Sequence, residues 1–262
     1  MLNSVLQSIA RQFGYVVMFK ALPDKPEMEM QGSKLDYEYL DRTATLIQEF
    51  TGTTPTNFCE VGANFAQDAA YLAAKWQIRP ENIVVFEPHP DIVEKIRGHY
   101  DFVVVPKAVS NVNKKMQFNA VKLENTSNSG ISSLRPHTLN NVDDNDLIEV
   151  EVIRLDEFAA KNGLNKIDFL KIDVEGLTFE VLEGLGDFLK NVSCIQIETE
   201  FITVWEDQHT QLDVYKLLEE NHFQLIDHLT QMDGVQADSL WIREDLVVHK
   251  IYDLSNKQWV NK

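Results

Sequence analysis

The chain has 262 residues, of which 44% are hydrophobic and 10% aromatic. This length suits one α/β domain with an extension, and the apolar content excludes a chain that is disordered or fibrous throughout. Its 24 basic and 41 acidic residues give a formal net charge of −17. That charge disfavours nucleic acid and anionic lipid as partners, because both would be repelled.

The cysteines and the N-terminus indicate a reducing compartment. Cys59 and Cys194 each lie in an apolar run, which is typical of reduced thiols in a core. Residues 1–19 have no Lys or Arg before Arg11 and no long apolar region with a cleavage site, so they lack the marks of a signal peptide. The apolar stretch 15–19 is far shorter than the ~20 residues that cross a bilayer. We therefore expect a cytoplasmic protein without stable membrane insertion, either a monomer or a homo-oligomer.

Residues 1–34 are predicted to form an N-terminal extension, with a short amphipathic helix over 2–13 and then a linker that contains proline and glycine. The domain itself is expected over 35–262. Its first element is a helix over 35–50, where apolar side chains recur at helical spacing.

From residue 57 onward, short apolar strands alternate with helices. Strands of this kind predict a parallel sheet that is covered on both faces. We therefore expect a doubly wound α/β fold with a mostly parallel seven-stranded sheet. A turn that contains Gly234 joins the last two strands, which predicts an antiparallel final pair. The predicted strands are 57–61, 83–86, 102–105, 167–172, 192–197, 223–229 and 239–242, and the predicted helices are 66–76, 91–99, 177–189 and 212–221.

A polar insertion at about 111–154 interrupts this alternation. Residues 116–123 and 149–153 alternate like strands, and no helical pattern occurs between 110 and 155. The segment 124–146 is rich in Asn, Ser and Asp. A polar loop of this length is typical of a lid, a binding loop or a mobile segment.

A tight turn follows the first strand, and an acidic residue ends the second. Gly62 in Glu60-Val-Gly-Ala-Asn64 has no Cβ, so a ligand can approach the backbone, and the amides that open the next helix favour an anion. Glu87, followed by Pro88, can accept hydrogen bonds from both hydroxyls of a ribose. Together these features predict a nucleoside pocket at the carboxyl edge of the sheet.

Two cofactors fit such a pocket, a nicotinamide dinucleotide and S-adenosylmethionine. A dinucleotide site requires glycines in the pattern G-x-G-x-x-G to admit the pyrophosphate, whereas Asn64 and Ala66 follow Gly62 here. Glu60 is a carboxylate inside an apolar strand, and the α-amino group of an amino-acid ligand would compensate its burial. The residues therefore favour S-adenosylmethionine.

The strand over 167–172 carries polar residues on one face. Lys171 and Asp173 share parity, and Glu198 lies on the matching face of the following strand. A lysine in a central strand needs a partner, so we expect Lys171 to pair with Glu198 in a buried polar layer. Asp173 and Glu175 lie at the carboxyl end of the strand, where ligands bind in this fold.

Several segments, in this order along the chain, resemble the FkbM family of S-adenosylmethionine-dependent methyltransferases over roughly residues 55–245. The Lys-Ile-Asp-Val-Glu-Gly run is the most specific of them. The segments are Glu60-Val-Gly-Ala-Asn64, Val85-Phe-Glu87-Pro88, Ala108-Val-Ser-Asn111, Ser129-Gly-Ile-Ser-Ser-Leu134, Leu155-Asp-Glu-Phe158, Phe169-Leu-Lys-Ile-Asp-Val-Glu-Gly176 and Glu180-Val-Leu-Glu-Gly184.

The resemblance implies a Rossmann-like fold of the class I methyltransferase type. It also implies methyl transfer to a hydroxyl of a sugar, glycoconjugate or secondary metabolite. The alternatives are a nicotinamide-dependent oxidoreductase and a non-catalytic nucleoside-binding protein of the same fold. The residues that would hold the cofactor are Glu60, Gly62, Asn64, Glu87, Ala108, Ser110 and Asp173.

An alcohol acceptor needs a base as it attacks the activated methyl group. Asp173 is the first candidate because it combines a strand end with an expected burial. Glu175 and His209 are the other candidates for the base, and the buried Lys171 completes the expected catalytic set.

We expect no metal at this site. The alternative is a divalent cation held by Asp173, Glu175, Glu198 and Glu200, since carboxylates are the hard ligands that such ions prefer. Trp205 either offers an apolar face to a sugar ring or packs in the interior.

Overall fold

The computed structural model describes residues 34–123, 129–138, 145–231, 234–248, 250–253 and 258–261. The helix predicted over 2–13 and its linker lie outside these residues. The helices are α3 (Lys34–Thr51), α4 (Gln67–Trp76), α5 (Pro90–His99), α6 (Leu155–Asn162), α7 (Thr178–Glu183) and α8 (Gln211–Glu220).

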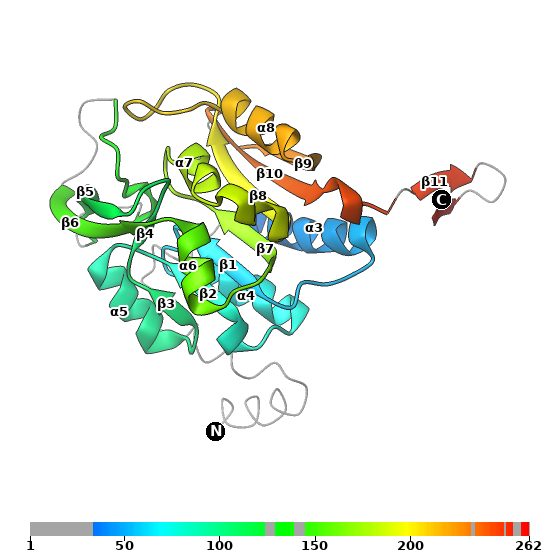
Figure 1. Ribbon diagram of the computed structural model, residues 1–262, viewed down its shortest axis with the longest axis horizontal. Coiled ribbons are helices and arrows are strands. Elements are labelled where there is room, and N and C mark those ends of the chain that lie inside the picture. The colour runs from blue at the N-terminus through cyan, green and yellow to red at the C-terminus, as the bar shows by residue number, and fades with distance from the viewer. Residues whose placement is uncertain are drawn as a thin grey trace.

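The main sheet has seven strands in the order β3-β2-β1-β7-β8-β10-β9 (Figure 1). Strands β3 to β8 of this order run parallel, and β10 is antiparallel to both of its neighbours. The predicted mostly parallel sheet with an antiparallel final pair is therefore confirmed. The strands are β1 (Phe58–Val61), β2 (Ile83–Phe86), β3 (Val103–Val105), β7 (Ile167–Ile172), β8 (Val192–Glu200), β9 (Phe223–Thr230) and β10 (Gln236–Arg243).

Two apolar cores cover the two faces of this sheet. Helices α3, α4 and α5 contribute to one core, where Phe58, Trp76 and Phe169 pack edge to face or tilted at 5.0–6.3 Å between ring centroids. Helices α6, α7 and α8 contribute to the other. Cys59 and Cys194 are free and buried, one in each core, as the apolar runs around them predict.

A second, three-stranded sheet accounts for the predicted insertion. Its strands are β4 (Ala108–Val109), β5 (Lys114–Val121) and β6 (Asn145–Ile153), in the order β4-β6-β5. It has a small core of its own, which includes Phe118 and Val152, and lies at one end of the main sheet (Figure 1). A hairpin of β11 (Lys250–Asp253) and β12 (Gln258–Asn261) extends from the opposite end.

Two helix predictions need correction. The helix expected over 177–189 is two pieces, α7 and a 3-10 segment over Gly186–Asn191, because Gly184 permits close approach of another segment. A Cβ on Gly184 would lie 2.2 Å from the carbonyl oxygen of Ser110. Helix α6 is not predicted at all; it is short and buries only Leu155 and Ala159, too narrow a stripe to show helical periodicity. Among the described helices, none is both long and apolar enough to cross a membrane.

Candidate active site at the carboxyl edge of the sheet

Gly62 is required by the end of a neighbouring strand. Its φ is +78°, and a Cβ there would lie 1.8 Å from the carbonyl oxygen of Asp173. The backbone N–H of Asp173 donates to the carbonyl of Val61 at 2.9 Å. The structure adds a packing reason to the expected ligand approach: glycine lets β1 and β7 place their ends side by side.

Two further residues of the turn have a left-handed backbone. Asn64 has a φ of 45° and Ala66 a φ of 55°. Asn tolerates this region, whereas Ala pays ~1–2 kcal/mol for it. Ala66 is fully buried directly before α4. Packing around its side chain therefore maintains a backbone conformation that a glycine would adopt without strain.

Glu87 is buried and held by two backbone amides. The N–H of His89 donates to Oε1 at 2.8 Å, and the N–H of Asn64 donates to Oε2 at 2.9 Å. Burial raises the pKa of Glu87 to about 7, although both hydrogen bonds act in the opposite direction. The carboxylate is thereby fixed at the tip of β2, beside the turn that follows β1.

A cavity that is partly open to solvent lies at this edge of the sheet. Five of the predicted cofactor residues line it: Gly62, Asn64, Glu87, Ala108 and Asp173. Its other side comes from the insertion. The lining residues there that the sequence interpretation did not assign to the site are Phe118, Gly130, Ser132 and Leu134. Gly130, Ser132 and Leu134 lie in the segment 129–134, which resembles the FkbM family but to which the sequence interpretation assigned no role.

Glu60 and Ser110, the other predicted cofactor residues, do not line this cavity. Ser110 directly follows β4 and is buried, with its carbonyl oxygen close to Gly184. Glu60 is 1% exposed, and among the described residues its Oε2 has no hydrogen-bond partner. Burial raises its pKa to about 8, with Lys171 opposing. An unsatisfied buried carboxylate oxygen fits the ammonium group of an amino-acid ligand.

Lys171 is paired, but not with Glu198. Its Nζ lies 3.0 Å from Asp173, 3.1 Å from Asp68 and 3.8 Å from Glu60. Strand β8 places Gln196 opposite Lys171, so the pairing predicted with Glu198 is wrong by two residues of register. Although burial opposes it, the surrounding carboxylates raise the pKa of the Lys171 ammonium well above its usual range.

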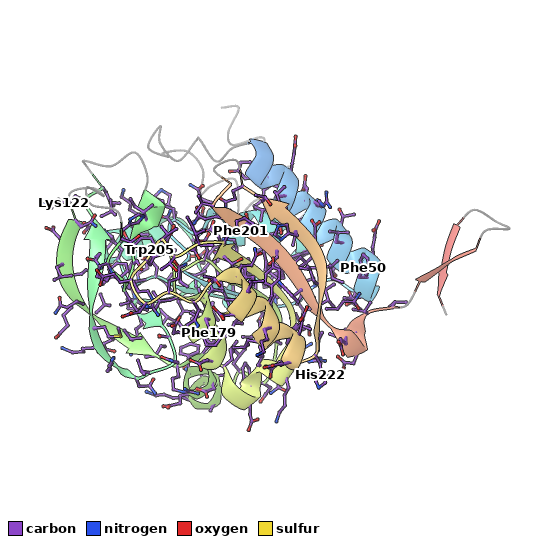
Figure 2. All side chains as sticks on the ribbon, turned by 90° about the horizontal axis from the view of Figure 1, so that it is seen from above. Phe50, Lys122, Phe179, Phe201, Trp205 and His222 are labelled. Atoms are coloured by element: carbon purple, nitrogen blue, oxygen red, sulfur yellow. The ribbon has the colours of Figure 1, made fainter. Side chains whose placement is uncertain are left out.

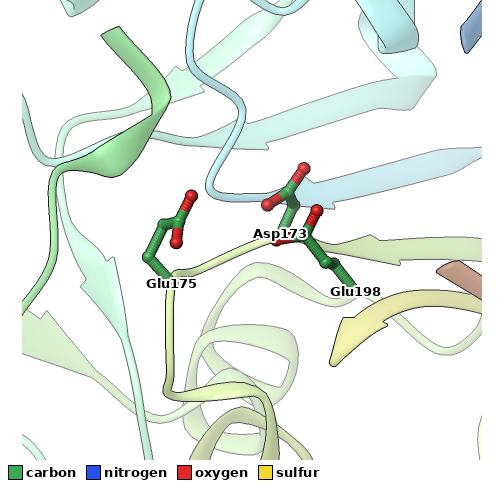
Figure 3. A group of neighbouring side chains, drawn as sticks. All are labelled: Asp173, Glu175 and Glu198. Carbon is green, nitrogen blue, oxygen red and sulfur yellow. The ribbon is translucent and has the colours of Figure 1, made fainter. Parts of the chain in front are cut away.

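Three carboxylates gather where β7 and β8 end (Figure 3). One oxygen each of Asp173, Glu175 and Glu198 lies within 4.8 Å of the others, an arrangement that could offer ligands to a hard cation. Glu200 is not part of that group among the described residues. Burial first, and then the neighbouring carboxylates, raise the pKa values of Glu175 and Glu198 well above their usual range.

His209 and Trp205 lie on the loop that follows β8. The ring of His209 stacks on Phe179 with 3.9 Å between centroids, and its nitrogens lie 3.8 Å from Glu180 and Asp213. The structure thus places His209 against α7 and α8. Trp205 is 3% exposed and packs against Gly176, which favours the packing interpretation over sugar stacking. Figure 2 shows Trp205 towards the three-stranded sheet, with Phe50 and His222 at the opposite end.

Comparison with known proteins adds to this geometry. Residues 60–225, more than half of the chain, match the methyltransferase FkbM domain. The hexuronic acid methyltransferase AglP of Haloferax volcanii is 24% identical over 147 residues, which are 53% of this chain and 54% of that protein. The matched part thus spans about half of that relative's length.

Solved structures give distant similarities. Methyltransferase FkbM of Methylobacillus flagellatus is 12% identical with a TM-score of 0.48, covering 71% of this chain and 43% of that one. Magnesium protoporphyrin IX methyltransferase of Synechocystis, crystallised with bound SAM, is 11% identical with a TM-score of 0.46, covering 92% and 96%.

Fold and family match together define an S-adenosylmethionine-dependent methyltransferase with a Rossmann-like sheet. The chain belongs to the FkbM methyltransferase family. The predictions of family, enzyme class and cofactor are therefore confirmed, and the oxidoreductase alternative is set aside.

Proposed function

We propose that this protein transfers the methyl group of S-adenosylmethionine to a hydroxyl group of a sugar, glycoconjugate or secondary metabolite. In this proposal Glu87 accepts hydrogen bonds from the ribose, Gly62 and Asn64 hold the methionine part, and Ala108 borders the adenine. Glu60 pairs with the ammonium group of the methionine part, and Ser110 supports the adenine side from its place directly after β4.

The observation that carries the proposal is the double position of Asp173. Asp173 lines the cofactor cavity and also belongs to the carboxylate group with Glu175 and Glu198. The sulfonium activates its own methyl group, so the protein has to align the acceptor and take its proton. A carboxylate shared by the cavity and the neighbouring acidic group is well placed for that proton transfer.

The charge around Asp173 favours a neutral hydroxyl over a carboxylate as the acceptor. Asp173 and Glu60 flank Lys171 inside the fold, and Glu175 and Glu198 add further carboxyl groups beside them. A uronate would bring one more negative charge into this region, at an electrostatic cost. The relative from Haloferax volcanii is described as a hexuronic acid methyltransferase, which supports a carbohydrate acceptor and makes the choice of functional group the point to test.

The test is methyl transfer from methyl-labelled S-adenosylmethionine to matched pairs of acceptors, neutral glycosides and the corresponding uronic acids. We expect labelled methyl ethers, which survive alkaline hydrolysis, on the neutral sugars. Label found only in esters that alkali cleaves would contradict the hydroxyl proposal. Binding of S-adenosylhomocysteine without transfer to any acceptor would favour the remaining alternative, a binding protein of the same fold.

A further inference from the structure

Residues 129–138, here called the strap, cross from the small sheet to the loop that follows β8. At one end the backbone of Ser133 exchanges hydrogen bonds with Asn119 of β5, at 2.8 and 3.3 Å. At the other end Thr138 donates to the carbonyl of Val204 at 2.9 Å, and Pro136 accepts from Glu206 at 3.0 Å. The strap thereby spans the opening between the two sheets.

The strap contacts both halves of the site. Gly130, Ser132 and Leu134 line the cofactor cavity. The hydroxyl of Ser133 donates to the carbonyl oxygen of Glu175 at 2.7 Å. Glu175 has a left-handed backbone, with a φ of 52°, so this hydrogen bond fixes a strained residue of the acidic group.

One side chain ties the middle of the strap to the main domain. Arg135 makes an ion pair with Glu180 of α7 at 2.5 Å, and its other terminal nitrogen donates to the carbonyl of Glu206 at 2.5 Å. The two side chains are 15% and 11% exposed. A pair this buried holds its geometry tightly, because separating the charges leaves each without compensation.

We propose that Arg135 is a positioning residue for cofactor binding, whose bridge to Glu180 and Glu206 keeps the strap seated over the cavity. The guanidinium lies between the strap segment that lines the cavity and the loop that carries Trp205. Its loss leaves the strap attached through the Ser133 hydroxyl and through backbone hydrogen bonds to Asn119, Val204 and Glu206, and the cavity then opens more readily. The inference rests on the proposed place of the cofactor in this cavity.

The experiment measures binding of S-adenosylhomocysteine to the full chain, by calorimetry for the dissociation constant and by stopped-flow displacement for the dissociation rate. For Arg135→Gln we expect the dissociation constant and the dissociation rate each to rise about tenfold, which corresponds to a loss of ~1.4 kcal/mol in binding free energy. Arg135→Lys retains one charged contact with Glu180, so its dissociation rate should lie between those of Arg135→Gln and the unmodified protein.

Arg243→Gln is the matched control. Arg243 also pairs with a carboxylate, that of Asp245, and donates to a carbonyl, that of Lys190, but it does not touch the strap. We expect a dissociation rate within about twofold of the original for this variant, because Arg243 neither lines the cavity nor bonds to a residue that does. A similar acceleration in both variants would mean a general loss of rigidity and would overturn the proposal.

A folded Arg135→Gln variant that releases S-adenosylhomocysteine at the original rate also overturns it. If Arg135→Gln fails to fold, Glu180→Gln decides, since it removes the charge that Arg135 pairs with while keeping the size of the side chain. We expect faster release in this variant, and unchanged release overturns the proposal. Glu87→Ala separates the premise from the inference. If Glu87→Ala binds S-adenosylhomocysteine with unaltered affinity, the proposed place of the cofactor is refuted. If Glu87→Ala binds it more weakly but Arg135→Gln releases it at the original rate, only the role of the strap is refuted.

Discussion

The ammonium nitrogen of Lys171 lies 3.0 Å from a carboxylate oxygen of Asp173, two residues further along the chain. Lys171 is buried within β7, whereas Asp173 follows the strand and lines the cavity. The same nitrogen also meets Asp68 and Glu60. One buried cation thus orients the first acidic residue of the site from inside the core.

Replacing Lys171 with Met should therefore affect both folding and cofactor binding. Removing the cation leaves the buried Glu60 and the half-buried Asp68 and Asp173 uncompensated, for which we expect a loss of ~3–5 kcal/mol in the free energy of unfolding. The affinity for S-adenosylhomocysteine should fall as well, because Asp173 loses its support. Urea denaturation and calorimetry measure the two effects. Lys75→Met is the control: its pair with Asp41 is exposed and should contribute under ~1 kcal/mol. Equal losses in both variants would contradict this role of Lys171.

Gly62→Ala should be among the most destabilising changes of a single methyl group in this chain. The added Cβ would meet the backbone of Asp173 at a φ of +78°, and we expect a cost of ~3 kcal/mol or more. Gly163 also has a positive φ, of +68°, but a Cβ there meets nothing within 4 Å. Gly163→Ala should then cost ~1–2 kcal/mol, for the backbone conformation alone. Chemical denaturation of the two variants compares them directly, and a Gly62→Ala variant as stable as Gly163→Ala would show that the two strand ends can move apart.

The fate of these residues shows what the sequence could and could not reveal. Gly62 and Glu87 were predictable because an apolar strand stops abruptly at each. The residue of β8 that lies opposite Lys171 was not predictable. Alternate residues of a strand point to the same face, so Gln196 and Glu198 are equivalent until the register is known. The strap has no periodic pattern, so the roles of Ser132 and Arg135 depend on contacts between distant segments that no local signal predicts.

Stability should decline as pH rises from mildly acidic to mildly basic values. Burial raises the pKa values of Glu87, Glu200 and Asp238 to about 7, above those of the unfolded chain. Between the two values the folded protein binds more protons, so the free energy of unfolding decreases with pH. Each of these groups should contribute about 2 kcal/mol to the decrease between about pH 5.5 and about pH 8.

Urea titrations across this range measure the decline. Glu198→Gln should make it shallower, because it removes one such carboxyl, and the amides of Gln231 and Gln236 beside it can turn to suit the change. Stability that rises through the same pH range would be contrary to the burial of these acids.

We expect no metal requirement at Asp173, Glu175 and Glu198. Both oxygens of Glu198 already accept amide hydrogens, from Gln231 at 2.5 Å and from Gln236 at 2.8 Å. The raised pKa values of Glu175 and Glu198 favour protonation, which relieves repulsion without a cation. The melting temperature with bound S-adenosylhomocysteine should be the same in EDTA and in magnesium or manganese. A rise with either metal that disappears in Glu198→Gln would establish a metal site instead.

Asp173→Asn should lose methyl transfer while it still binds the cofactor. Positioned general bases contribute ~10²–10⁴-fold to rate, and we expect a reduction of about that size in kcat once an acceptor is identified. Asn keeps the shape and a carbonyl oxygen for Lys171, so cofactor affinity should change far less than turnover. Glu175→Gln should have a smaller effect on kcat, since Glu175 does not line the cavity.

His209→Ala is the control for the remaining candidate base. Because His209 stacks on Phe179 and faces Glu180 and Asp213, we expect its removal to lower kcat less than about tenfold. Initial rates across a pH series, with S-adenosylhomocysteine affinity measured in parallel, separate chemistry from binding. Full turnover by Asp173→Asn with normal cofactor binding would exclude Asp173 as the base, and a large loss in His209→Ala together with a shifted pH profile would assign that role to the histidine.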